Sequence, residues 1–146
     1  MIRKGPARVQ HTRQKDQHQI GQGLVEFTIG ITFILILLAG AVDLGRAYFT
    51  YIALLDASQE GASYASFEPV DVVGIRSRVR ESSTGMVDLS TLTDDEIEII
   101  WGAQTCAGHG VTVRVHYTFD FIAPFIGGLT LPLSAEVTDT ILQPPC

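Results

Sequence analysis

Residues 27–42 read FTIGITFILILLAGAV, sixteen consecutive positions without a charged side chain. As an α-helix this run covers about 24 Å, and adding Leu24 and Val25 brings it close to the ~30 Å hydrocarbon core of a bilayer. The run is apolar on every face and leaves no polar stripe for solvent. It therefore predicts a transmembrane helix rather than the buried helix of a soluble domain.

The segments on either side of this run differ in charge. Residues 1–21 carry five basic side chains and one acid, whereas residues 22–146 carry five basic side chains and fifteen acids. By the positive-inside rule the N-terminus is cytoplasmic and the C-terminus lies outside. We therefore expect a basic, disordered cytoplasmic leader at 1–21, a transmembrane and stalk helix at 22–68, and an extracytoplasmic α+β region at 69–146. Nucleic-acid binding is not expected, because the basic side chains are not concentrated on the folded part.

The helix is expected to continue past the membrane to Ser66, because no proline occurs between Ala7 and Pro69. Apolar and small residues fall on one stripe at steps of three and four, which predicts a packed face. This stripe consists of Leu44, Ala47, Tyr48, Tyr51, Leu55, Ser58, Ala62 and Ala65.

Small residues recur at four-residue steps along the same helix, at Ala41 and Gly45 and again at Ala57, Gly61 and Ala65. Small side chains let another backbone approach closely. Alanine alone would only indicate good helix formation, but a glycine inside a helix costs roughly 1 kcal/mol relative to alanine. We therefore predict helix packing through these five positions.

The region after Pro69 predicts a second helix and a small sheet. Residues 70–83 have the pattern of a short amphipathic helix, with three arginines on its solvated face. Residues 96–101, 111–121 and 131–142 alternate between apolar and polar side chains, which is typical of half-buried strands. Three antiparallel strands with one apolar face can pack on the outer half of the long helix, which gives an α+β fold, a helical stalk with a small sheet laid against it.

Glu26 is a carboxylate at the start of the apolar segment, where a charged side chain costs about 2.5–3.5 kcal/mol on insertion scales. One interpretation is that it stays hydrated at the cytoplasmic interface. The other supposes that the chain is cut after Gly21, so that Gln22 carries a new α-amine and Glu26 is the fifth residue. Glu26 of one subunit can then pair with the amine of a neighbour and set the axial register of a helical assembly.

Two further pairs of residues are candidate contacts. Asp43 and Arg46 are three residues apart on the helix and can form an ion pair at the outer membrane boundary, although two independently hydrated charges are the alternative. Cys106 and Cys146 both fall in the region expected outside the cytoplasm, where a disulfide is allowed. Unpaired thiols and a bond between two chains remain open alternatives.

Three motifs along the helix are similar to one known family. GQGLVEF at residues 21–27, GAVDLGR at 40–46 and ASQEGA at 57–62 together resemble the TadE-like family of the tight-adherence (Tad) type IV pilus system. The resemblance implies a pseudopilin of the bacterial inner membrane, cut after Gly21 by a prepilin peptidase, that assembles with itself or with related pilin subunits and can enter an extracellular filament.

The chain departs from the usual TadE-like pattern at three positions. Thr32 stands where family members usually have proline, and Gln59 and Ser63 stand where they often have arginine. The stalk therefore lacks two positive charges, and its packing partners can differ. These departures leave open whether the chain is a minor pseudopilin or a main filament subunit.

Two other processing schemes fit the same sequence. The chain can remain uncleaved, as a single-pass, signal-anchored protein with an extracytoplasmic binding domain. Alternatively, Ala39, Gly40 and Ala41 supply small residues for a secretory signal cleavage that would release a soluble domain.

Catalysis is not expected, and neither is a cofactor, a small-molecule substrate or a metal. The part after residue 21 has only His109 and His116, with no Gly-x-Ser-x-Gly elbow and no His-Glu-x-x-His motif. Cys106 and His109 lack two further ligands for zinc. The acidic run at residues 94–96 lacks a glycine-centred calcium pattern, so it is interpreted as a solvated loop.

Overall fold

The computed structural model describes residues 13–83, 87–123 and 128–143. Residues 1–12 of the expected leader and Cys146 lie outside the described residues. The chain divides into two structural units, residues 1–41 and 42–146.

Helix α1 (Arg13–Ala65) comprises 53 residues and includes parts of both units. It begins at Arg13, inside the expected leader, rather than at Gln22. Lysine and glutamine are good helix formers, and extending an existing helix is easier than nucleating a new one. The apolar segment can therefore propagate helix into the polar residues before it.

The first unit exposes the apolar segment of α1 along its length. The hydroxyl of Thr28 donates to the carbonyl of Leu24 at 2.8 Å, and that of Thr32 donates to the carbonyl of Thr28 at 2.7 Å. Both hydroxyls are satisfied within the helix, as a hydrocarbon environment requires. Among the described residues, one helix is long and apolar enough to cross a membrane, and it is this one.

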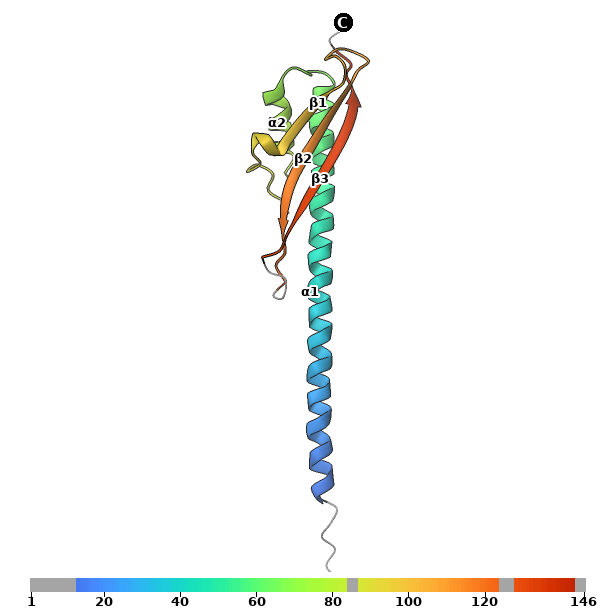
Figure 1. Ribbon diagram of the computed structural model, residues 1–146, viewed down its shortest axis with the longest axis vertical. Helices are drawn as coiled ribbons and strands as arrows, with labels where there is room; N and C mark the ends of the chain where they lie inside the picture. Colours follow the sequence, from blue (N-terminus) through green and yellow to red (C-terminus); the bar gives the residue numbers. More distant parts are fainter. Residues whose placement is uncertain (1–12, 84–86, 124–127, 144–146) are drawn as a thin grey trace, which may run out of the picture. The chain divides into compact units, whose positions relative to one another are not determined.

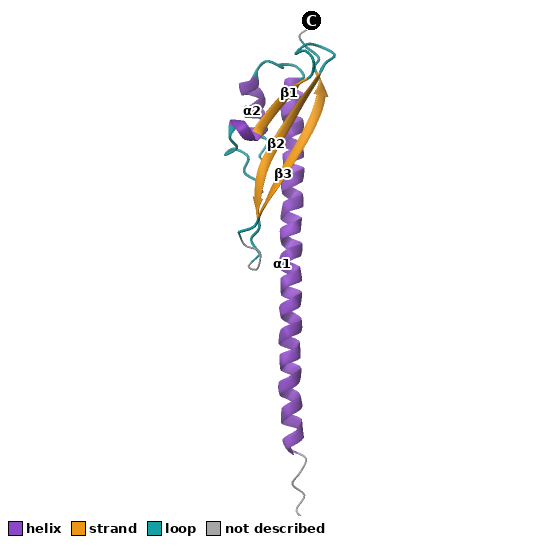
Figure 2. Cartoon of the chain, in the orientation of Figure 1, coloured by secondary structure: helices purple, strands orange, loops and turns teal. Residues whose placement is uncertain are grey.

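The second unit contains the C-terminal part of α1, a short helix and a sheet (Figures 1 and 2). Helix α2 (Val72–Glu81) is followed by the 3-10 turn η1 (Asp94–Glu96) and by strands β1 (Ile97–Trp101), β2 (Gly110–Asp120) and β3 (Thr130–Thr140). The strands are antiparallel in the order β1-β2-β3. This arrangement confirms the predicted α+β class, with a long apolar N-terminal helix, a second short helix and three strands.

The register of the sheet separates an apolar face from a charged one. Val113 pairs with Ile99 and Val137, and the alternate residues Val111 and Val115 of β2 are also fully buried. On the other face Arg114 lies between two carboxylates, at 2.8 Å from Glu98 on β1 and 2.6 Å from Glu136 on β3. The apolar face forms the core with α1 and α2.

Gly61 of α1 lies where the two helices and β2 meet. A Cβ atom at this position would be 2.7 Å from Cγ2 of Val79 on α2 and 3.2 Å from Cγ1 of Val113. Only a residue without a side chain permits this approach without a shift of its neighbours. The remaining buried side chains of α1 in this core are Ala53, Leu54, Ala57, Ser58, Ala62 and Ala65.

The predicted stripe of α1 is right in its second half, where Ser58, Ala62 and Ala65 are fully buried, and wrong in its first half. Leu44, Tyr48 and Tyr51 were expected on the packed face but are exposed in this chain, whereas Asp43 and Thr50 are buried. In the first half of the stripe the prediction placed the larger apolar side chains in the core. The sheet instead packs on the neighbouring line of small residues, where its backbone can approach more closely.

Candidate assembly and membrane-boundary site

Gly21 and Gln22 are adjacent on α1, Glu26 lies one turn further along, and all three are exposed. The peptide bond after Gly21 is inside the helix, and the space where a Cβ of Gly21 would stand is open. Glu26 makes no hydrogen bond or ion pair with any residue that the structure describes. Its neighbours Val25 and Phe27 are both exposed apolar side chains. A carboxylate in such surroundings needs a cation or water from outside the described part of the chain.

At the other end of the apolar run, Asp43 is only 3% exposed and makes three polar contacts. Its Oδ1 lies 2.9 Å from Nη1 of Arg46, so the predicted pair is present. Its Oδ2 accepts the backbone N–H groups of Ile122 at 3.1 Å and Ala123 at 2.7 Å. The carboxylate therefore joins α1 to the connection between β2 and β3.

Sequence reasoning missed this link to the β2–β3 connection. The ion pair is local, and its three-residue spacing indicates it directly. The two backbone donors come from residues far along the chain, and no side chain at residues 122–123 signals that its amide points to a carboxylate. An aspartate placed directly after an apolar run was the only available signal.

Arg46 makes a second contact that the spacing of charges does not reveal. Its guanidinium carbon lies 5.1 Å from the ring centre of Phe119 near the end of β2, within the range of a cation–π interaction. The two residues also line a cleft of about 200 Å³ with Phe49, Thr50 and Tyr117. This volume is below the roughly 300–1,000 Å³ of small-molecule sites.

The predicted small-residue stripe divides into two parts. Ala57, Gly61 and Ala65 are buried in the core of this chain. Ala41 is exposed, and a Cβ on Gly45 would meet no atom within 4 Å. The outer three positions therefore pack within the chain, and only Ala41 and Gly45 remain uncovered.

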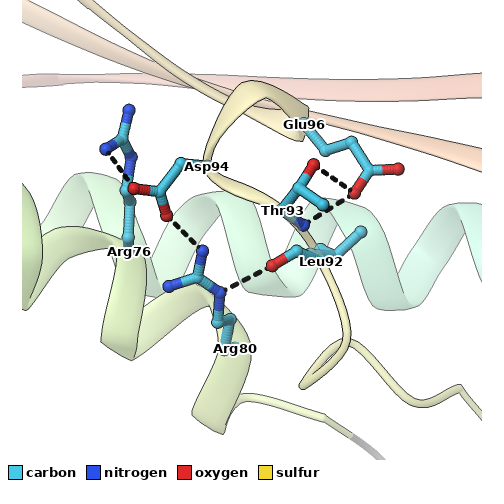
Figure 3. Close-up of polar contacts among 6 residues, drawn as sticks. All are labelled: Arg76, Arg80, Leu92, Thr93, Asp94 and Glu96. Carbon is cyan, nitrogen blue, oxygen red and sulfur yellow. Dashed lines mark hydrogen bonds and ion pairs between the residues drawn. The ribbon is translucent and has the colours of Figure 1, made fainter.

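Helix α2 is fastened to η1 by the cluster drawn in Figure 3. Nη1 of Arg76 lies 2.9 Å from Oδ2 of Asp94, Nη2 of Arg80 contacts the other carboxylate oxygen, and Nε of Arg80 donates to the carbonyl of Leu92 at 2.8 Å. The hydrogen bond from Arg80 holds the pKa of Asp94 below its ordinary value. Arg76 and Arg80 are half-buried by these contacts, so the interpretation of the α2 arginines as a solvated face holds only for Arg78. Asp94 is 62% exposed, which agrees with the predicted solvated loop.

The same turn is capped by Glu96. Its Oε2 accepts the backbone N–H of Thr93 at 2.7 Å and lies 2.8 Å from the Thr93 hydroxyl (Figure 3). The described residues contain no group of three or more histidine, cysteine or acidic side chains placed to hold a metal ion. The cluster is a structural clamp between α2 and the start of β1.

The predicted disulfide cannot be located, because Cys146 lies outside the described residues. The backbone nevertheless brings its neighbourhood close to the connection that carries Cys106. The N–H of Gly108 donates to the carbonyl of Ile141 at 2.9 Å, and the N–H of Ile141 donates to the carbonyl of His109 at 2.8 Å. The pairing of Cys106 with Cys146 stays a prediction that this geometry supports.

Comparison with known proteins gives one family match. A family model described as TadE-like protein matches residues 21–63. No curated protein and no solved structure gives a significant match to the chain. The matched range includes Gly21, Glu26 and Asp43, and it agrees with the resemblance read from the three motifs. It relates the chain to Tad pilus systems and fits a pilin-like, single-pass membrane protein. Over residues 21–63, less than half of its length, the chain is similar to the TadE-like family.

Proposed function

We propose that the chain is a pilin-like, TadE-type subunit of a Tad type IV pilus system, cut after Gly21 by a prepilin peptidase and assembled through its N-terminal helix. The observation that carries the proposal is Glu26. It is an exposed carboxylate beside the apolar run, without a partner among the described residues, and it is the fifth residue counted from Gln22.

Cleavage after Gly21 would supply the missing cation. The new α-amine of Gln22 in one subunit can pair with Glu26 of the next, which neutralises both charges in a low-dielectric environment. Because a buried pair is stable only with good geometry, it favours one axial offset between neighbouring helices. The pairing thus couples processing to assembly register.

The uncovered surface of α1 supplies the packing contact for such an assembly. Ala41 has only a methyl group and Gly45 has no side chain, so both positions allow close helix–helix approach. The nearby side chains of Leu44 and Tyr48 are largely apolar, and they are 69% and 63% exposed to solvent, respectively. A neighbouring helix on this surface would bury both kinds of residue. The sheet side of α1 is already occupied by the chain's own core.

The experiment compares Glu26→Ala with Asp56→Ala in cells that carry the pilus system. Asp56 is also an exposed acid on α1, and it makes no hydrogen bond or ion pair with the described residues. Glu26→Ala should insert into the membrane normally but be lost from cross-linked oligomers and from the sheared surface fraction. Asp56→Ala should behave like the unaltered protein. Normal assembly of Glu26→Ala would refute the register role.

A second function has one observation in its favour. Helix α1 continues through Gly21 to Arg13 without a break, so the proposed cleavage bond is held in helical form. This supports an uncleaved, signal-anchored protein whose outer unit binds a partner outside the cytoplasm. The two proposals share a membrane topology and differ in the N-terminus of the membrane-extracted protein.

A further inference from the structure

The connection between β2 and β3 exposes two large apolar side chains. Ile122 is 69% exposed and Leu129 is 58% exposed. The N–H of Phe121 donates to the carbonyl of Leu129 at 3.3 Å, so both ends of the connection are held together. Gly128 has a φ of 91°, a backbone conformation that favours glycine. Single exposed apolar side chains are common on proteins, so the distinguishing feature of Ile122 and Leu129 is their position in the chain's fold.

Asp43 holds this connection beside α1, next to the end of the apolar run. Its carboxylate accepts the N–H groups of Ile122 and Ala123, and it directly follows Val42, the last residue of the apolar run. The backbone at residues 122–123 therefore lies within hydrogen-bond distance of the first side chain after the run. This holds for any orientation of the outer unit relative to the residues before it. Charge-assisted hydrogen bonds are stronger than neutral ones, which suits a fixed attachment.

We propose that Ile122 and Leu129 enter the interfacial layer of the membrane beside the span, so that the partner of this surface is lipid. The proposal rests on the membrane anchoring in the proposed function but not on cleavage or assembly. The polar layer outside the hydrocarbon core is only several ångströms thick, so apolar side chains attached at the end of the span reach its apolar boundary. The negative charge of Asp43 is balanced by its ion pair with Arg46.

A second membrane contact beside the helix has a mechanical consequence. A single span can tilt and rotate in a bilayer, and contacts at the interface restrict both motions. The β2–β3 connection would fix which side of α1 faces the lipid and which side remains open to a neighbouring subunit. It would also hold the sheet close to the membrane surface.

The test places one tryptophan at a time in the full chain, reconstituted in phosphatidylcholine vesicles with brominated acyl chains. The native Trp101 is first replaced by phenylalanine. Ile122→Trp and, separately, Leu129→Trp are then compared with two references. Leu35→Trp reports the span, and Val73→Trp reports an outer surface, since Val73 of α2 is 79% exposed. Circular dichroism melting confirms that each variant is folded.

The proposal expects blue-shifted emission and a loss of intensity at positions 122 and 129 with lipids brominated near the headgroup. Position 35 should lose more intensity with lipids brominated deep in the chain, and position 73 should lose none. If folded variants at 122 and 129 behave like position 73 while position 35 is quenched, the proposal is overturned and the span stands. If position 35 is not quenched either, the anchoring fails as well.

Releasing the connection separates attachment from simple exposure. Asp43→Ala removes the acceptor of both backbone N–H groups. Combined with Ile122→Trp, it should reduce quenching at position 122 and leave quenching at position 35 unchanged. Undiminished quenching at position 122 would overturn the role of Asp43 in placing this connection at the membrane.

Discussion

The carboxylate of Asp43 accepts the backbone N–H of Ala123 at 2.7 Å, which ties the helix at the end of the apolar run to the connection that follows β2. The same side chain pairs with Arg46, whose guanidinium lies over the ring of Phe119. One buried acid thus organises a helix, a strand end and a connection. In the sequence it lies directly after the apolar run, at the start of the second unit.

Asp43→Ala should loosen the β2–β3 connection without unfolding the sheet. Ile122 and Ala123 lose the acceptor of their N–H groups, so hydrogen–deuterium exchange at these two amides should become faster. Exchange in β1 should not change. Asp56→Ala is the control, since it removes an exposed acid from the same helix. Unchanged protection of both amides in Asp43→Ala would show that the carboxylate does not hold the connection.

Gly61→Leu should destabilise the outer unit by about 1–3 kcal/mol, because the new side chain collides with Val79 and Val113. Gly45→Leu is the matched comparison on the same helix. Open space surrounds Gly45, and replacing glycine removes a helix penalty of roughly 1 kcal/mol, so its stability should be equal or higher. Thermal unfolding of both variants in detergent micelles measures the difference. Equal melting temperatures would contradict the packing described at Gly61.

The same pair of variants also separates folding from assembly. Gly45→Leu should fold normally but weaken oligomer formation, because the small surface for a neighbouring helix is filled. Chemical cross-linking in membranes measures this effect. Full oligomer yield in Gly45→Leu would show that a neighbouring helix does not use this surface.

Stability should depend on pH through Asp94. The hydrogen bond from Arg80 lowers the pKa of the folded-state carboxyl, so the ionised form is favoured by folding. Its contribution is present above the unfolded-state pKa of about 3.9 and is lost as the pH falls through the lower folded-state value. Asp94→Asn should therefore lower the urea midpoint at neutral pH, and the difference from the unaltered protein should shrink towards about pH 3.

Asp95→Asn is the control for that measurement, because Asp95 makes no hydrogen bond or ion pair with the described residues. It should shift the midpoint little at either pH. A difference for Asp94→Asn that is constant with pH would mean that the ion pairs with Arg76 and Arg80 are not the source of the effect.

Cys106 and Cys146 should form a disulfide in protein taken from outside the cytoplasm. Intact mass before and after reduction should differ by about 2 Da, and Cys106→Ser should abolish the difference. Backbone hydrogen bonds join Gly108 and His109, close to Cys106 in the sequence, to Ile141, which is five residues before Cys146. Alkylation of both thiols without prior reduction would contradict the bond.

Element types were accessible from sequence because each has a strong local signal. The sixteen-residue apolar run and the alternation around residues 111–121 are set by nearest neighbours. The exposure of the first half of the α1 stripe was not accessible, because Leu44 and Tyr48 are as apolar as true core residues. The face of α1 that becomes buried is determined by the sheet, which can pack closely on the helix only where Gly61 leaves space.

The contacts of the candidate site also divide into those that the sequence predicts and those that depend on the tertiary fold. The pair between Asp43 and Arg46 follows from helical spacing, whereas the two amides bound by Asp43 depend on the tertiary path of the chain. The same holds for the arginines of α2. On an isolated helix Arg76 and Arg80 would be solvated, and they contact Asp94 only because the segment after α2 folds back against the helix. Polar contacts between segments distant in sequence carry no local pattern.

The mass of the membrane-extracted protein tests the central claim most directly. Mass spectrometry is preferable to Edman degradation, because an N-terminal glutamine can cyclise with loss of ammonia and block the chemistry. Cleavage after Gly21 predicts a mature chain that begins at Gln22, and cyclisation after extraction would lower its mass by that of the ammonia lost. A chain that retains residues 1–21, or one that begins at or after Ala41, would contradict the proposal.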